Sequence, residues 1–127
     1  MSLDITPAIV TGGQLIQRYG DGGFRVAGID YQGSIIVRVD ATDRWPVSAV
    51  SEIDLTSLTP LSGVSPAVDI LLIGCGPRFS PPPSDLRRGL KNAGMVLEWM
   101  DTGAACRTFN VLLAEGRAVA AALIANP

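Results

Sequence analysis

The chain has 127 residues, of which 47% are hydrophobic and 17% are charged, and its formal net charge is −2. A chain of this length buries about two-thirds of its unfolded surface as one domain, so we expect a single domain over residues 1–127. The acidic balance argues against binding to phosphate backbones, and the sequence contains no histidine, the commonest general base and metal ligand. We therefore expect no nucleic-acid partner, no metal site and no cofactor.

The cysteines and the apolar segments give no sign of export or of a membrane anchor. Cys75 and Cys106 are the two cysteines of the sequence, and thiols without an export signal are typical of a reducing compartment. The longest apolar run, residues 118–125, is too short to span a bilayer. We expect a cytoplasmic protein with free thiols and no membrane-spanning segment.

The first third of the chain has the pattern of antiparallel β-structure. Residues 14–19 and 24–29 alternate between apolar and polar or small side chains, and the Gly-Asp-Gly-Gly turn at 20–23 separates them. Residues 35–39 are rich in β-branched side chains, which favours a further strand, and residues 31–34 form the turn before it. We expect these strands to form an antiparallel meander.

The next part of the chain gives weaker signals. Residues 40–44 are expected to be a polar loop, and a short extended stretch begins at Trp45. Between residues 51 and 68 the apolar side chains have near-helical spacing, but Pro60 would break a long helix. We therefore expect one short helical turn within a loop.

A stretch at residues 69–74 organises the second half of the chain. Its unbroken apolar run predicts a strand that is buried on both faces and lies at the centre of the sheet. Ser84 is expected to cap a helix that Gly94 ends, and residues 95–100 form a second strand of buried type. Residues 69–100 therefore predict a βαβ unit with two parallel neighbouring strands.

The C-terminal part of the chain continues the same alternation of elements. Asp101 or Thr102 is expected to cap a helix over residues 104–115, which has an apolar face and ends at Gly116. Residues 117–124 are rich in alanine, so helix and strand compete there. The helix stop at Gly116 favours a strand, and the fold class is α/β with a mixed sheet.

Several segments resemble a known family of small domains of unknown function, which includes a mitochondrial assembly factor for respiratory complex I (NADH:ubiquinone oxidoreductase). The N-terminal match is looser, around residues 19–34 and Trp45. The specific matches are Ile-Gly-Cys-Gly at 73–76, Met-Asp-Thr-Gly-Ala-Ala-Cys-Arg-Thr-Phe-Asn at 100–110 and Leu-Leu-Ala-Glu-Gly-Arg-Ala-Val-Ala-Ala-Ala-Leu at 112–123.

The resemblance implies a three-layer α/β domain, with a mixed central sheet, a helical layer on one side and the β meander on the other. It implies no established catalytic activity and, in mitochondria, a protein-partner role in the assembly of a membrane complex. Cys75 and Phe109 stand where threonine and tyrosine are usual, which weakens a role for a conserved hydroxyl group at either position. We therefore expect a non-enzymatic domain that binds another protein during assembly of a respiratory membrane complex.

Two loops, residues 74–79 and 101–107, form the candidate site because both follow parallel strands. The first-turn N–H groups of the helix and the Arg107 guanidinium could hold a carboxylate or phosphate, which makes a small-anion-binding protein or an enzyme the alternative function. In a purely structural interpretation, Asp101 caps the helix and Arg107 pairs with an acidic side chain. The candidate residues are Gly74, Cys75, Gly76, Asp101, Thr102, Gly103 and Arg107, with Phe79 as an interface residue.

Two features of these loops have simpler explanations than a cofactor or a reactive group. The Gly-Cys-Gly motif at 74–76 lacks the third glycine of a dinucleotide fingerprint, since Phe79 occupies that position. Tight turning explains its glycines. Cys106 near a helix start could have a lowered pKa, but without a histidine base we expect it to be a packed hydrophobic residue.

Overall fold

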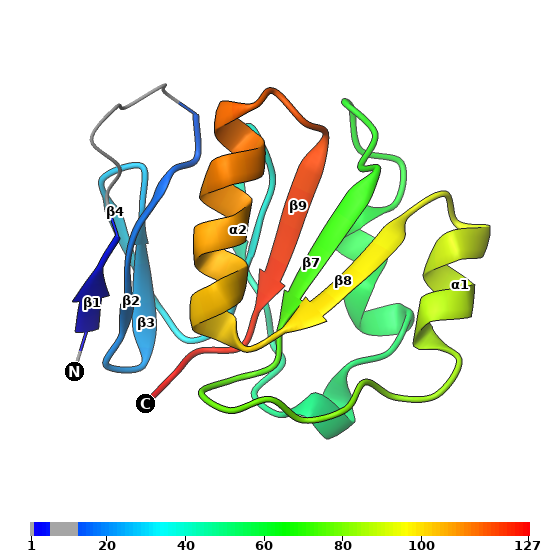
Figure 1. Ribbon diagram of the computed structural model, residues 1–127, viewed down its shortest axis with the longest axis horizontal. Coiled ribbons are helices and arrows are strands. Elements are labelled where there is room, and N and C mark those ends of the chain that lie inside the picture. The colour runs from blue at the N-terminus through cyan, green and yellow to red at the C-terminus, as the bar shows by residue number, and fades with distance from the viewer. Residues whose placement is uncertain (1, 6–12) are drawn as a thin grey trace.

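The computed structural model describes residues 2–5 and 13–127, which form two β-sheets and the helices that cover the larger one (Figure 1). The strands are β1 (Ser2–Asp4), β2 (Ile16–Gly20), β3 (Gly23–Val26), β4 (Ile29–Gln32), β5 (Ile35–Val37), β6 (Thr42–Arg44), β7 (Ile70–Gly74), β8 (Val96–Met100) and β9 (Val119–Leu123). The helices are α1 (Leu86–Asn92) and α2 (Thr102–Ala114), with two short 3-10 helices, η1 (Val50–Glu52) and η2 (Thr56–Leu61). The smaller sheet has the order β1-β2-β3-β4 and the larger sheet has the order β6-β5-β9-β7-β8.

The smaller sheet is the antiparallel meander that the sequence predicts. β2 pairs with β3 across the glycine turn, and β3 pairs with β4. Its last turn lies at Ala27 and Gly28, which have positive φ values of 48° and 82°, rather than at residues 31–34. The expected turn at 31–34 is therefore wrong for its first half: Tyr31 lies in β4 opposite Phe24, where the two aromatic side chains form a cross-strand pair.

β5 belongs to the larger sheet and not to the meander. It pairs antiparallel with β6 on one side and with β9 on the other, so the expectation for residues 35–39 is wrong in this respect. All three residues of β5 are buried, as is typical of a strand with both faces covered. The expected loop at 40–44 is wrong for residues 42–44, because these form β6, an edge strand with polar residues.

The βαβ unit over residues 69–100 is confirmed. β7 and β8 pair in parallel from Ile70 opposite Val96 to Gly74 opposite Met100, and α1 connects them. β9 runs parallel to β7 and antiparallel to β5, so the sheet is mixed. The middle strand is β9 and not β7, contrary to expectation. The alanines of β9 are fully buried and leave room for larger side chains on both faces.

Two expectations for the helical segments also need correction. The residue before α1 is Asp85, which has a φ of 68° and makes no capping hydrogen bond with its side chain, so Ser84 is not the cap. The segment at 51–68 contains two 3-10 helices rather than one helical turn, and η2 includes Pro60. A 3-10 helix of this length contains few backbone hydrogen bonds, so a proline within it removes few of them.

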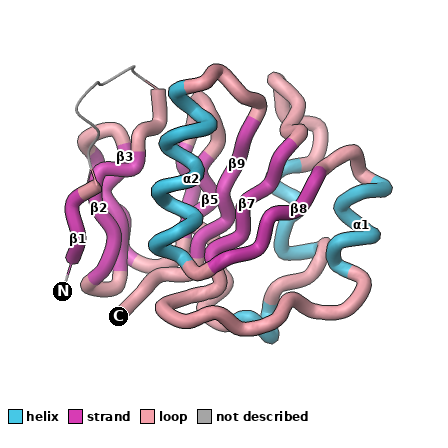
Figure 2. The backbone as a smooth tube through the Cα atoms, viewed as in Figure 1, coloured by secondary structure: helices cyan, strands magenta, loops and turns pink. Residues whose placement is uncertain are grey.

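The larger sheet carries a hydrophobic core on each face, because side chains alternate along its strands. Leu71 and Ile73 point to the core beneath α1, η1 and η2, whereas Leu72 points to the core beneath α2. Ile16 and Phe24 of the smaller sheet join this second core. The helix α2 and the meander therefore share one face of the larger sheet, as Figure 2 shows, instead of lying on opposite faces. None of the described helices has the length and apolar character that a bilayer span requires.

Candidate functional site

The two candidate loops meet at the carboxyl ends of β7 and β8. The Thr102 N–H donates to the Gly76 carbonyl over 2.9 Å, and the Gly76 N–H donates to the Thr102 hydroxyl over 2.9 Å. The same hydroxyl donates to the carbonyl of Ile124 over 2.7 Å. One threonine therefore joins the end of β7, the start of α2 and the end of β9.

This junction is closed to solvent. Thr102 is fully buried, and a Cβ atom on Gly74 would lie 2.8 Å from both the Thr102 Cα and its Oγ1. Gly76 has a φ of 112°, which glycine adopts without a steric penalty. The glycines and the threonine thus pack closely against one another, and Gly76 and Thr102 form hydrogen bonds with each other. These contacts position the start of α2.

The other predicted residues of the second loop lie at the first turn of α2. The Asp101 carboxylate accepts a hydrogen bond of 2.9 Å from the Ala104 N–H, so Asp101 is the helix cap and satisfies one free amide of the first turn. Arg107 is exposed, and its Nη1 donates over 3.1 Å to the hydroxyl of Tyr19. Within the described part of the chain, Arg107 pairs with this hydroxyl rather than with a carboxylate, contrary to the structural interpretation given above.

Tyr19 is a site residue that the sequence did not point to. Its hydroxyl lies over Gly103, where a Cβ atom would be 2.7 Å from the Tyr19 oxygen. Gly103 is buried under this side chain, so Gly103, like Gly74, is required by close packing. The contact links β2 of the smaller sheet to the first turns of α2, through residues 88 positions apart in the sequence.

Both thiols are free and buried. Cys106 is fully buried among the apolar residues under α2, and this burial raises the pKa of its thiol, with the nearby Arg107 opposing the shift. The prediction that Cys106 is a packed hydrophobic residue is confirmed. The Cys75 Sγ donates to the carbonyl of Arg78 over 3.4 Å, within the loop that follows β7.

The loop after β7 presents Phe79 to solvent, with 64% of its surface exposed. The indole N–H of Trp99 donates to the Ser80 carbonyl over 2.6 Å. This hydrogen bond fixes the loop at the residue after Phe79. An aromatic side chain on a fixed loop is a common anchor in protein interfaces. Other large apolar side chains are also exposed, namely Leu3, Ile29, Leu55, Val96 and Val111.

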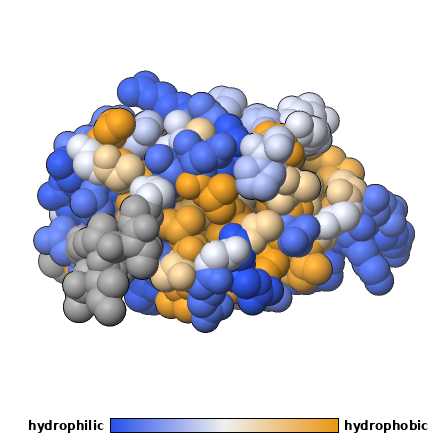
Figure 3. Space-filling model, turned by 90° about the horizontal axis from the view of Figure 1, so that it is seen from above, coloured by the Kyte–Doolittle hydropathy of each residue, from blue (hydrophilic) through white to orange (hydrophobic). Residues whose placement is uncertain are grey.

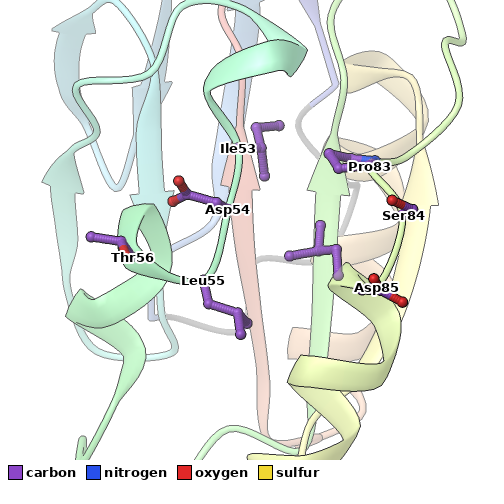
Figure 4. Close-up of a pocket in the computed structure, with 8 residues that line it drawn as sticks. Ile53, Asp54, Leu55, Thr56, Pro83, Ser84 and Asp85 are labelled. Carbon is purple, nitrogen blue, oxygen red and sulfur yellow. The ribbon is translucent and has the colours of Figure 1, made fainter.

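A surface pocket of about 320 Å³ lies between residues 53–56 and residues 83–86 (Figure 4). Asp54 and Asp85 come from its two walls, but both carboxylates have partners: Asp54 accepts a hydrogen bond from the Ser57 N–H, and Asp85 lies 3.3 Å from Arg88. Because its walls come from separate parts of the chain, no local pattern predicts the pocket. Among the described residues, no group of metal-ligating side chains is close enough to hold a metal ion.

Several known proteins are similar to this chain in sequence or in structure. A zebrafish (Danio rerio) protein named NADH dehydrogenase (ubiquinone) 1 alpha subcomplex assembly factor 3 is 33% identical over 126 residues, which cover 99% of this chain and 72% of that protein. A Bartonella henselae crystal structure, described as an outer membrane protein, is 38% identical with a TM-score of 0.78 and covers 91% of this chain and 98% of its own. A Bordetella pertussis solution structure, described as a Mth938-like domain, is 27% identical with a TM-score of 0.77 and covers 97% of this chain and 92% of its own.

A family model provides the assignment. The model described as Protein of unknown function (DUF498/DUF598) matches residues 16–124, which include every residue of the candidate site. The resemblance found in the sequence is thereby confirmed, and the chain belongs to the DUF498/DUF598 family of proteins of unknown function.

Proposed function

We propose that this chain is a non-enzymatic domain that binds another protein and takes part in the assembly of a respiratory membrane complex. The observation that carries the proposal is its similarity to the zebrafish assembly factor, which extends over 99% of the chain. A match of this extent concerns the whole chain rather than one motif. The cytoplasmic location expected from the sequence is part of the same proposal, and cell fractionation tests it.

The geometry of the candidate site supports a binding role better than a chemical one. Gly76 and Thr102 form hydrogen bonds with each other in a buried junction. Burial raises the pKa of the Cys106 thiol, which disfavours the nucleophilic thiolate. Arg107 and Phe79 are both exposed in these loops, and Phe79 is the large apolar side chain among their exposed residues. In this proposal Phe79 contacts the partner.

The test is a quantitative affinity purification of the tagged chain from the cells that produce it. Wild type is compared with Phe79→Ser and with a matched control, Ile29→Ser, whose side chain is 56% exposed on the smaller sheet. Subunits or assembly proteins of a respiratory complex should be recovered with wild type and with Ile29→Ser. Their affinity for Phe79→Ser should be about thirtyfold lower, because truncation of an interface anchor costs about 2 kcal/mol.

The outcomes distinguish the binding function from the role of Phe79 in it. If no protein is enriched over an untagged strain, the binding function is refuted. If the same proteins are recovered equally with Phe79→Ser, the binding function stands and Phe79 is not its anchor.

The alternative function, binding of a small anion at residues 74–79 and 101–107, has one observation in its favour: the two loops do meet. It is the weaker proposal, because Asp101 and Thr102 bind neighbouring backbone groups. The test is the melting temperature in phosphate and in chloride at matched ionic strength. A rise in phosphate that Arg107→Ala abolishes would support the anion site, and an unchanged melting temperature would contradict it.

A further inference from the structure

The face of β8 beside α2 is only partly covered: Val96 is 57% exposed and Glu98 is exposed, whereas Leu72 on the same face of the neighbouring β7 is buried under α2. In Figure 1, α2 crosses in front of the larger sheet on the side of the meander, and β8 lies at the far edge of that sheet, next to β7. A groove of about 420 Å³ runs along these strands and the flank of α2. We call it the β8 groove, and its lining includes Ile70, Val96, Glu98, Met100, Leu112 and Arg117.

The two faces of β8 have opposite environments. Leu97, on one face, is 1% exposed in the core beneath α1, whereas Val96, on the groove face, is 57% exposed. Parallel strands are normally covered on both faces, so the exposed face of β8, the edge strand of the sheet, is unusual. Seen from above, hydrophobic side chains gather in the middle of the molecule and hydrophilic ones at the end where α1 lies (Figure 3).

The length of the open face matches a short helix. Strands of five residues extend about 16 Å, which equals about three helical turns of 5.4 Å. A helix placed there would lie beside α2 and extend the helical layer over the sheet.

The charge of the β8 groove restricts what can occupy it. Glu98 lies between Val96 and Met100 on the groove face, and within the described residues no ion pair or hydrogen bond engages its carboxylate. Covering an unpaired carboxylate with apolar side chains carries a large desolvation cost. Arg117, at the end of the groove, already faces Glu115 over 3.9 Å. An occupant therefore needs an apolar stripe and a cation of its own for Glu98.

We propose that the β8 groove binds an amphipathic α-helix of about three turns from a partner protein, with a lysine or arginine at the middle of its apolar face paired with Glu98. This proposal rests on the protein-binding function proposed above and names the class of partner. The helix lies beside α2 and covers Val96 and Met100.

The first step of the test maps the contact on the full chain in the cells that produce it. A benzophenone amino acid replaces Val96 in the groove, Phe79 in the loop, or Ile29 as an exposed control, and cross-linked peptides are identified by mass spectrometry after irradiation. The expected result is a cross-link from position 96 to a segment with apolar residues at helical spacing and a basic residue among them. Position 29 should give no such product.

The second step tests the charge pair on the purified chain. A synthetic peptide of the segment cross-linked to position 96 is titrated into wild type, Glu98→Lys and a matched control, Asp43→Lys, which changes an exposed residue on the opposite edge strand. Binding should weaken at least tenfold with Glu98→Lys and not with Asp43→Lys. A peptide whose basic residue is changed to glutamate should regain affinity for Glu98→Lys. Unchanged melting temperatures show that the variants are folded.

Other outcomes overturn the proposal in distinguishable ways. A cross-link from position 96 to a second copy of this chain, or to a segment without helical periodicity, refutes the assigned occupant. A partner captured through position 79 but not through position 96 refutes the β8 groove and leaves the protein-binding function standing. No specific capture from positions 79 and 96 refutes both assigned contacts, and the affinity purification described above then decides whether the protein-binding function stands. Equal peptide binding by Glu98→Lys and wild type refutes the charge pair.

Discussion

At the scale of single residues, the junction between the two candidate loops depends on one buried hydroxyl group. Thr102 accepts a hydrogen bond from Gly76 and donates one to Ile124. Because Thr102 is fully buried, water cannot replace either bond if the hydroxyl is removed. Thr102 therefore stabilises the fold by providing hydrogen-bond partners for the Gly76 N–H and the Ile124 carbonyl.

We predict that Thr102→Val lowers the free energy of unfolding by at least about 2 kcal/mol, because it leaves the Gly76 N–H and the Ile124 carbonyl unpaired and each buried unpaired group costs about 1–3 kcal/mol. Valine has nearly the same shape, so the change removes the hydroxyl with little change in packing. Urea denaturation measures the loss. Thr102→Ser, which keeps the hydroxyl, should recover most of the stability, and a loss of equal size in both variants would show that the methyl group matters instead.

The carboxylate of Glu52 gives a prediction about pH. It accepts hydrogen bonds from the Ser48 N–H, the Ser48 hydroxyl and the Ala49 N–H over 2.8–3.0 Å, and these bonds, the Ser48 N–H above all, hold its pKa below the ordinary 4.5. A carboxyl whose pKa is lower in the folded state stabilises the fold above its unfolded pKa and loses that contribution as the pH falls through the folded pKa.

We therefore expect Glu52→Gln to be less stable than wild type at pH 7, and the difference to shrink as the pH falls below 4.5. Parallel urea denaturation of the two proteins at pH 7, 4 and 3 measures it, and NMR titration of Glu52 gives its pKa directly. A stability difference that stays constant over this range would contradict the prediction.

At the scale of elements, two glycines show where the packing of secondary structure leaves no room for a side chain. A Cβ atom on Gly74, at the end of β7, would lie 2.8 Å from the backbone Cα of Thr102. On Gly89 in α1, the Cβ would lie 2.6 Å from Cδ1 of Leu55, the far end of a side chain that is 48% exposed. The first neighbour is held by the sheet and the helix, and the second can rotate away.

We expect opposite results from the two alanine substitutions. Gly74→Ala should destabilise the protein by about 1–3 kcal/mol, because the start of α2 must move away from β7. Gly89→Ala should be neutral or should stabilise it by up to about 1 kcal/mol, because alanine favours the helix more than glycine does. Thermal and urea denaturation of both variants check the pair, and a stabilised Gly74→Ala would show that the junction is more open than the structure indicates.

At the scale of the whole molecule, Asn110 connects α2, which packs on the larger sheet, to the smaller sheet. Its side chain accepts a hydrogen bond of 2.9 Å from the Ile16 N–H and donates one of 2.8 Å to the Ile16 carbonyl. The ladder between β2 and β3 shifts register just after Ile16, so the asparagine binds the backbone of β2 next to an irregularity. Both residues are buried, and they lie 94 positions apart in the sequence.

We predict that Asn110→Ala lowers the free energy of unfolding by at least about 2 kcal/mol, since it leaves two buried backbone groups without partners. It should also speed hydrogen exchange at the Ile16 amide and at its neighbours in β2. Val111→Ala is the matched control, because Val111 is 56% exposed on the same helix, and we expect it to change stability by less than about 0.5 kcal/mol. Equal losses in the two variants would show that the helix and not the connection is affected.

The sequence by itself determined the elements of the second half of the chain. The apolar run of β7, the cap at Asp101 and the stop at Gly116 are local signals, because they depend on backbone geometry within a few residues. The parallel pairing of β7 with β8 followed from their short connection through α1. The family and the general fold could be recognised for the same reason, since the matching segments are short and contiguous.

Only the tertiary structure decided which strands pair and what the candidate loops do. Periodicity shows how many faces of a strand are buried but not its neighbour, so the position of β9 at the centre and of β5 beside it could not be read from the sequence. The candidate loops were located correctly at the end of β7 and β8, yet their closure depends on hydrogen bonds between residues far apart in the chain, as Thr102 with Ile124 and Arg107 with Tyr19 demonstrate. Long-range contacts also define the β8 groove, because its walls come from separate elements that only the completed sheet brings together.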